Sequence, residues 1–150
     1  MGHLFIVVMS VVLLSIVVVG GINYISSDVG ARTDAVRQIA TSRNAIEGAI
    51  ASYRMANRGT LPPADMAWKA ALDGYIARGG YDVPEGLTWR YLPTDGGQRV
   101  LCLEATAPIS KALQQALERS AVGAAQLGTA CPGDEGEVAA ALVVPLQHLE

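Results

Sequence analysis

The apolar positions of this chain form one long block, then a helical stripe, then a region of mixed period. From Leu4 to Ile25 the side chains are apolar except for scattered Ser, Gly, Asn and Tyr, and no Asp, Glu, Lys or Arg stands before Asp28. A helix rises ~1.5 Å per residue, so roughly 20 such residues cross the ~30 Å hydrocarbon core of a bilayer. The pattern predicts a membrane anchor over residues 1–27. The anchor is expected to include Leu4, Phe5, Val11, Leu14, Val18 and Ile22.

A cleavable signal peptide is the alternative interpretation of this apolar run. Such a peptide starts with Lys or Arg, has a shorter apolar core and ends at a site of small residues. Here only Met1 to His3 precede the run, although Val29 to Ala31 has the composition of a cleavage site. We favour a retained anchor, and a cleaved chain that begins at Arg32 stays as the alternative.

The second block, Ala31 to Asn57, is amphipathic. Its apolar residues recur at helical steps of three, four and seven, and one arginine interrupts them on the same stripe. Such a stripe either packs on its own domain, which we favour, or forms a coiled-coil seam with a partner. The arginine either pairs with a carboxylate of the head or of a partner, or covers apolar surface with its stem, which we favour. The stripe consists of Val36, Ile39, Arg43, Ile46, Ile50 and Tyr53.

Beyond Gly59 the hydrophobic period changes more than once. Turn residues separate two alternating segments, which predicts a β-hairpin, and a later apolar run predicts a third, buried strand. The expected elements are helices at 63–77 and 108–122, strands at 87–91, 99–105 and 138–146, and a turn at 93–97. The predicted fold class is therefore α+β. It comprises an N-terminal transmembrane helix, an amphipathic helix, and a small domain with about three strands and two further helices. The amphipathic helix and the small domain together form the predicted α+β domain, residues 28–150.

The cysteines change the picture of the compartment. Cys102 and Cys131 have no C-x-x-C spacing, and with only His3 and His148 beside them no usual zinc site can be assembled. A disulfide is the better interpretation, and it would place residues 28–150 in the periplasm; two buried thiols in a reducing compartment are the alternative. The arginines after the apolar run favour the opposite orientation, but the tail before it is very short. We therefore use the cysteine pair to assign residues 28–150 to the periplasm.

Charge and motifs exclude several classes of function. The net charge of −3 is spread without a basic block, so no nucleic-acid partner is expected. Phosphate-binding loops, zinc-protease motifs and nucleophile elbows are absent from the sequence. Asp134, Glu135 and Glu137 could hold a cation but are better explained as a solvated loop. We therefore expect no enzyme, no catalytic residue, no cofactor and no metal.

The overall plan resembles that of type IV pilin-like proteins. The residues that carry this resemblance are a long apolar N-terminal helix, Tyr53-Arg54 with Asn57, the run Gly59-x-Leu61-Pro62, and a head with two cysteines. One feature of pilins is missing, because the fifth position after Gly2 is Val7 where pilins carry Glu. A basic leader is also absent.

A closer resemblance is to the PilM family of conjugative type IVb thin pili. Met1-Gly2 with Leu4-Phe5, Asn23-Tyr24 after the apolar run, and Tyr53-Arg54 with Asn57 are the residues that suggest it. The resemblance implies a single-pass inner-membrane protein of pilus biogenesis, non-enzymatic, with a periplasmic domain and with other inner-membrane pilus assembly proteins as partners. Oligomerisation could use the small residues of the anchor. The alternatives are a minor pilin or pseudopilin of the filament, and an exported enzyme or binding protein with a cleaved signal.

Overall fold

The computed structural model describes residues 2–64, 67–94, 97–105, 108–132 and 139–146, without the side chains of residues 2–5 and 18–28. These residues form an α+β structure, in agreement with the predicted class. The helices are α1 (Gly2–Ala56), α2 (Trp68–Leu72) and α3 (Lys111–Ser120). The strands are β1 (Leu87–Pro93), β2 (Arg99–Ala105), β3 (Gln126–Gly128) and β4 (Ala140–Pro145).

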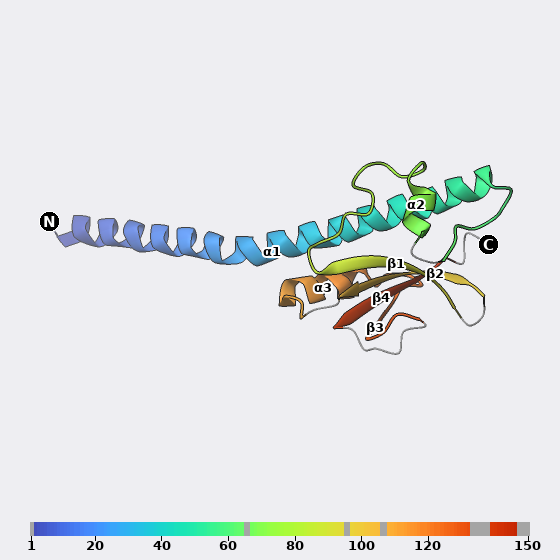
Figure 1. Ribbon diagram of the computed structural model, residues 1–150. Coiled ribbons are helices and arrows are strands. Elements are labelled where there is room, and N and C mark those ends of the chain that lie inside the picture. Colours follow the sequence, from blue (N-terminus) through green and yellow to red (C-terminus); the bar gives the residue numbers. More distant parts are fainter. Residues whose placement is uncertain (1, 65–66, 95–96, 106–107, 133–138, 147–150) are drawn as a thin grey trace.

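Helix α1 is continuous over 55 residues. Its N-terminal half projects away from the rest of the molecule, and its C-terminal half lies along the sheet (Figure 1). The sequence left open a break or bend near Gly30, but the helix runs through it. A glycine inside a helix costs only about 1 kcal/mol relative to alanine, and no proline stands before Pro62 to remove a backbone hydrogen bond. The two blocks of the sequence are therefore one rod.

The C-terminal end of α1 is closed by a left-handed residue. The Gly59 amide donates to the Arg54 carbonyl at 2.8 Å, which is the six-residue bond of a Schellman motif. Arg58 has a φ of 55° and Gly59 a φ of 88°. The stop lies where the sequence predicts it, but an arginine occupies the first left-handed position, where glycine has no steric cost.

The sheet has four antiparallel strands in the order β1-β2-β4-β3. The β1–β2 hairpin is confirmed, with Trp89 opposite Leu103. The C-terminal strand is also confirmed as β4, which pairs with β2 and lies inside the sheet. The expectation of about three strands was one short, because β3 adds an outer strand beside β4. Three exposed residues are too few to give a strand period.

The core lies between the sheet and the three helices. The central strands alternate, so that one face of the sheet meets the C-terminal half of α1, and α3 contacts the same cluster. The largest fully buried side chains of this cluster include Ile39, Ile46, Ile50, Leu72, Trp89, Tyr91, Leu101, Leu103, Leu117, Leu142 and Val144. The opposite face of the sheet carries a smaller cluster around Cys102, Cys131 and Ala141.

The two helices after α1 are both present but shorter than predicted. Among the described residues of the expected 63–77, only Trp68–Leu72 is α-helical, and the chain then turns through Gly79, whose φ is 79°. The Tyr81 hydroxyl donates to the Lys69 carbonyl and holds this turn against α2. Helix α3 begins at Lys111, because the Ser110 hydroxyl accepts a hydrogen bond from the Leu113 amide and caps it.

A membrane-spanning helix was part of the predicted architecture. Among the residues searched, which are those that the structure describes, no helix is both long enough and apolar enough to cross a membrane.

Candidate functional site

The His, Cys, Asp and Glu side chains of the described residues do not form a metal-binding cluster. No three His, Cys, Asp or Glu side chains among them lie close enough to share a metal ion. Asp134, Glu135, Glu137 and His148 lie outside the described residues. The candidate functional features of this chain are therefore surfaces: the projecting part of α1, the stripe that follows it, and the edges of the head.

The projecting part of α1 exposes apolar side chains on all of its sides. Every described side chain from Ile6 to Val17 is exposed, Leu14 by 70% and Val11 by 59%. The remaining predicted anchor side chains, those of Leu4, Phe5, Val18 and Ile22, lie outside the description. Ser10 and Ser15 each donate to the carbonyl four residues earlier, which removes their hydroxyl donors from the surface. An all-apolar helix surface is typical of helices covered by lipid or by other helices.

The stripe on the second half of α1 packs inside the head. Ile39, Ile46 and Ile50 are at most 1% exposed, and Val36 and Tyr53 are partly buried against the same cluster. This arrangement corresponds to the interpretation of the stripe as a core face. These side chains thus pack within their own chain.

Arg43 is the polar residue of the stripe, and its partner lies on the same helix. Its Nε is 2.8 Å from Glu47 Oε1, and both side chains are about 30% exposed. The sequence suggested an acid of the head, a partner's carboxylate, or a covering stem, and the structure shows an ion pair with an acid one helical turn away. A hollow of ≈ 230 Å³ beside this pair is lined by Val122 and Leu146 among others.

Ser42 is a buried polar residue that the sequence analysis did not single out. It is 2% exposed, and its Oγ accepts a hydrogen bond from the Trp89 indole nitrogen at 2.9 Å. The same hydroxyl donates to the Ile39 carbonyl at 3.1 Å. The signal was present in the sequence, because Ser42 falls three residues after Ile39 and four before Ile46, on the buried stripe. The bond fixes α1 to β1.

The predicted disulfide between Cys102 and Cys131 is confirmed. It ties the loop after β3 to β2, with 5.9 Å between the two Cα atoms and both residues buried. Glu104 lies on the same face of the sheet, is 9% exposed, and receives a hydrogen bond from Arg90 Nη1 at 3.0 Å. Buried carboxylates are tolerated when they are paired in this way. The disulfide and the ion pair therefore both stabilise this face of the sheet.

Tyr91 is a second buried polar side chain. Its hydroxyl has no hydrogen-bond partner, and burial raises the pKa of Tyr91 to about 12 against a smaller opposing effect of Arg99. The Arg99 guanidinium carbon lies 5.9 Å from the centre of the Tyr91 ring. A buried hydroxyl without a partner costs stability.

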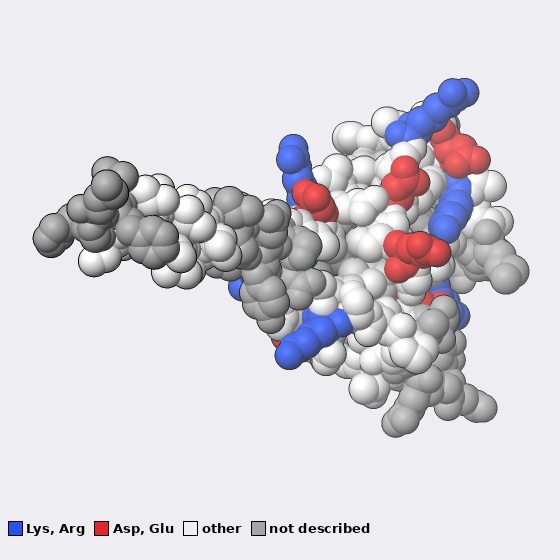
Figure 2. All heavy atoms as spheres, turned by 90° about the vertical axis from the view of Figure 1, so that its left-hand side faces the viewer, with Lys and Arg blue, Asp and Glu red and all other residues white. Residues whose placement is uncertain are grey.

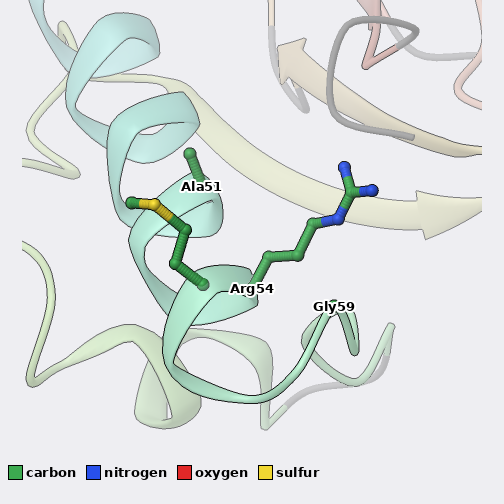
Figure 3. A pocket seen from close by; sticks show the side chains of 4 residues that line it. Ala51, Arg54 and Gly59 are labelled. Atoms are coloured by element: carbon green, nitrogen blue, oxygen red, sulfur yellow. The ribbon is translucent and has the colours of Figure 1, made fainter.

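An apolar hollow lies at the far end of α1. Ala51, Arg54, Met55 and Gly59 line a space of ≈ 310 Å³, and Met55 is 79% exposed. Figure 3 shows the Arg54 side chain extending from the last turn of the helix, with Ala51 one turn earlier and Gly59 in the loop that follows. The hollow is shallow and holds one charged group, so it offers a contact surface more than a ligand site.

Comparison with protein families, with curated proteins and with solved structures finds no match for this chain.

Proposed function

We propose that this protein is a non-enzymatic, membrane-anchored assembly protein of a type IV pilus biogenesis apparatus, with residues 28–150 in the periplasm. The observation that carries the proposal is that one uninterrupted helix, α1, has two parts with different surroundings. Apolar side chains surround its first part, and its second part is built into the core of the head. The assignment to a pilus biogenesis apparatus rests on the resemblance of the sequence to the PilM family.

The apolar side chains in the projecting part of α1 are exposed to solvent and require lipid or another protein to bury them. Side chains such as Leu14 and Val17 are about 70% exposed, and exposed apolar patches of this extent mark membrane or protein contacts. The sequence from Leu4 to Ile25 is long enough for the lipid of one bilayer to supply this cover. A helix satisfies its own backbone hydrogen bonds, which is what the hydrocarbon core requires. We therefore take lipid as the principal partner.

The disulfide supports the periplasmic side. Bridges such as Cys102–Cys131 persist in oxidising compartments, and this one is buried on the face of the sheet away from α1. The buried polar side chains Ser42 and Glu104 are used in structural hydrogen bonds. These hydrogen bonds stabilise the head.

The membrane part of the proposal is tested by a charge in the centre of the apolar run. Leu14 lies near the middle of Leu4 to Ile25, and a lysine at the centre of a span costs about 2.5 to 3.5 kcal/mol on insertion scales. We expect Leu14→Lys to move the full-length protein out of the sodium carbonate-resistant membrane fraction, and Leu14→Ala to stay in it. Equal recovery of both variants in the soluble fraction would contradict the anchor.

The assembly part is tested in the native host. Deleting the gene should reduce the number of pili on the cell surface, and intact protein should be found in the inner membrane and not in sheared filaments. Wild-type pilus numbers in the deletion strain would contradict the proposal. An intact mass that begins at Arg32 would instead indicate a cleaved signal and an exported protein.

A minor pilin or pseudopilin is the second candidate. It is favoured by the continuity of α1, because a rod with its head on one half can pack side by side with copies of itself (Figure 1). Val7 stands where pilins carry the Glu that meets a neighbouring subunit, so such packing would lack that pairing. Recovery of the chain in sheared filaments would decide for this candidate.

A further inference from the structure

A small basic pocket lies where α1 leaves the head. It has a volume of ≈ 220 Å³ and lies between α1 and the first turns of α3. Its lining residues are Val29, Arg32, Lys111, Ala112 and Gln115. Two of the five are cationic and none is acidic, so the pocket is suited to an anion.

Arg32 is the central group of this pocket. One of its terminal nitrogens donates to Gln115 Oε1 at 3.0 Å, which holds the guanidinium in place against α3. Its Nε is buried and has no hydrogen-bond partner. A guanidinium never loses its charge in a protein and has no acceptor of its own. A guanidinium that lines the pocket suits a ligand that brings an oxygen acceptor, and a negative one best.

Lys111 adds a second positive charge at the mouth of the pocket. It is exposed, and no salt bridge among the described residues uses it or Arg32. It is also the first residue of α3, where the helix dipole adds to the positive potential. Figure 2 looks at the molecule from the side on which α1 projects and shows blue side chains on both sides of its base, with red ones nearby.

We propose that this pocket binds the phosphate of a phospholipid headgroup and so fixes the head at the membrane surface. This inference rests on the proposed membrane anchor. Arg32 stands seven residues after Ile25, about 10 Å along the helix. Side chains of a helix lean toward its N-terminus, which directs Arg32 back toward the bilayer. The headgroup layer is about 5 to 8 Å thick on each side of the hydrocarbon core, so the phosphate plane is within reach.

The test measures lipid retained by the full-length protein in mild detergent. Native mass spectrometry with added phosphatidylglycerol should show one tightly held lipid on the wild type. Arg32→Gln should weaken its apparent Kd by roughly tenfold to a hundredfold, the range of a lost hydrogen bond to a charged group. Arg32→Lys keeps the charge but loses the planar set of guanidinium donors, and should lie between the two. Arg119→Gln, which removes an exposed charge elsewhere on α3, is the matched control and should match the wild type.

The outcomes separate this inference from the anchor on which it rests. Equal lipid retention by Arg32→Gln, Arg119→Gln and wild type would overturn the pocket, even if all three remain in the membrane fraction. Equal lipid retention by wild type and Arg32→Gln, together with binding of inorganic phosphate that is lost in Arg32→Gln, would show that free phosphate is the ligand and would overturn the lipid assignment. Tryptophan fluorescence and an intact disulfide check that each variant is folded. Loss of the wild type from the membrane fraction would instead refute the anchor.

Discussion

The hydrogen bond between Ser42 and Trp89 allows a sharp test of how α1 is held on the sheet. Both residues are 2% exposed, and the donor and acceptor atoms are 2.9 Å apart. In Ser42→Ala the indole N–H stays buried and loses its acceptor. A buried donor left without a partner costs about 1 to 3 kcal/mol. For a head of this size that corresponds to a fall in Tm of roughly 3 to 5 °C for each kcal/mol.

A double-mutant cycle isolates this contribution from the effects of the single changes. Trp89→Phe removes the indole N–H, so Ser42→Ala should cost little in that background, and the coupling energy should be about 1 to 3 kcal/mol. Urea unfolding of the full-length protein in detergent, followed by Trp68 fluorescence, gives the free energies because Trp68 is 5% exposed and present in all variants. Equal costs of Ser42→Ala in both backgrounds would refute the reasoning.

A matched serine on the same helix provides the control. Ser52 also donates to the backbone of α1, at 2.9 Å from the Gly48 carbonyl, but it accepts no bond from the sheet. Ser52→Ala should therefore change the free energy of unfolding by less than about 0.5 kcal/mol.

Three further predictions follow from single features of the head. Replacing Cys102 and Cys131 together by alanine should lower the free energy of unfolding by about 3 to 4 kcal/mol, because the bridge closes a loop of 29 residues, and a reductant should affect the wild type only. Arg58→Gly should stabilise the head by up to about 1 kcal/mol by removing a side chain from a left-handed conformation, whereas Gly59→Ala should destabilise it. Tyr91 has a pKa of about 12 in the fold and near 10 when unfolded, so stability present below pH 10 should fall as pH rises to 12. Tyr91→Phe should weaken this fall and should not destabilise the protein at pH 7, since the lost hydroxyl has no partner.

Much of the fold could be predicted from local pattern. Alternation and turn residues identify the β1–β2 hairpin, and the apolar run near the C-terminus identifies β4. The disulfide followed from the absence of any other use for two cysteines. The stripe on α1 followed from its period, and the structure places it in the core. For the hairpin, β4 and the stripe, one short segment contains the physical cause of its own conformation.

The failures have a different origin. The run through Gly30 depends on the sum of hydrogen bonds along both halves of α1, which outweighs a single weak breaker. The short α2 and the three-residue β3 depend on neighbours distant in sequence: Tyr81 holds the turn after α2, and β4 gives β3 its hydrogen bonds. Tertiary contacts of this kind leave no periodic signal in the segment itself.

The candidate surfaces also differ in whether the sequence alone could predict them. The apolar surface of α1 is visible in the sequence, since each residue contributes to it independently. The basic pocket is not, because Arg32 and Gln115 are 83 positions apart and meet only when α3 packs on α1. Arg32 alone is one of several arginines after the apolar run, and nothing in its neighbourhood distinguishes it.

The continuity of α1 gives these two surfaces a common consequence. A hinge at Gly30 would let the head turn freely about the anchor, and a phosphate contact would then have to overcome that freedom. Without a hinge, the seven residues between Ile25 and Arg32 set both the height of the pocket above the apolar segment and its direction around the helix axis. If the proposed anchor and phosphate site hold, the helix preorganises the pocket at the level of the headgroups, and a single bound phosphate fixes the orientation of the head. A fixed orientation presents the same face of the sheet to every partner in an assembly, which a flexible tether would not.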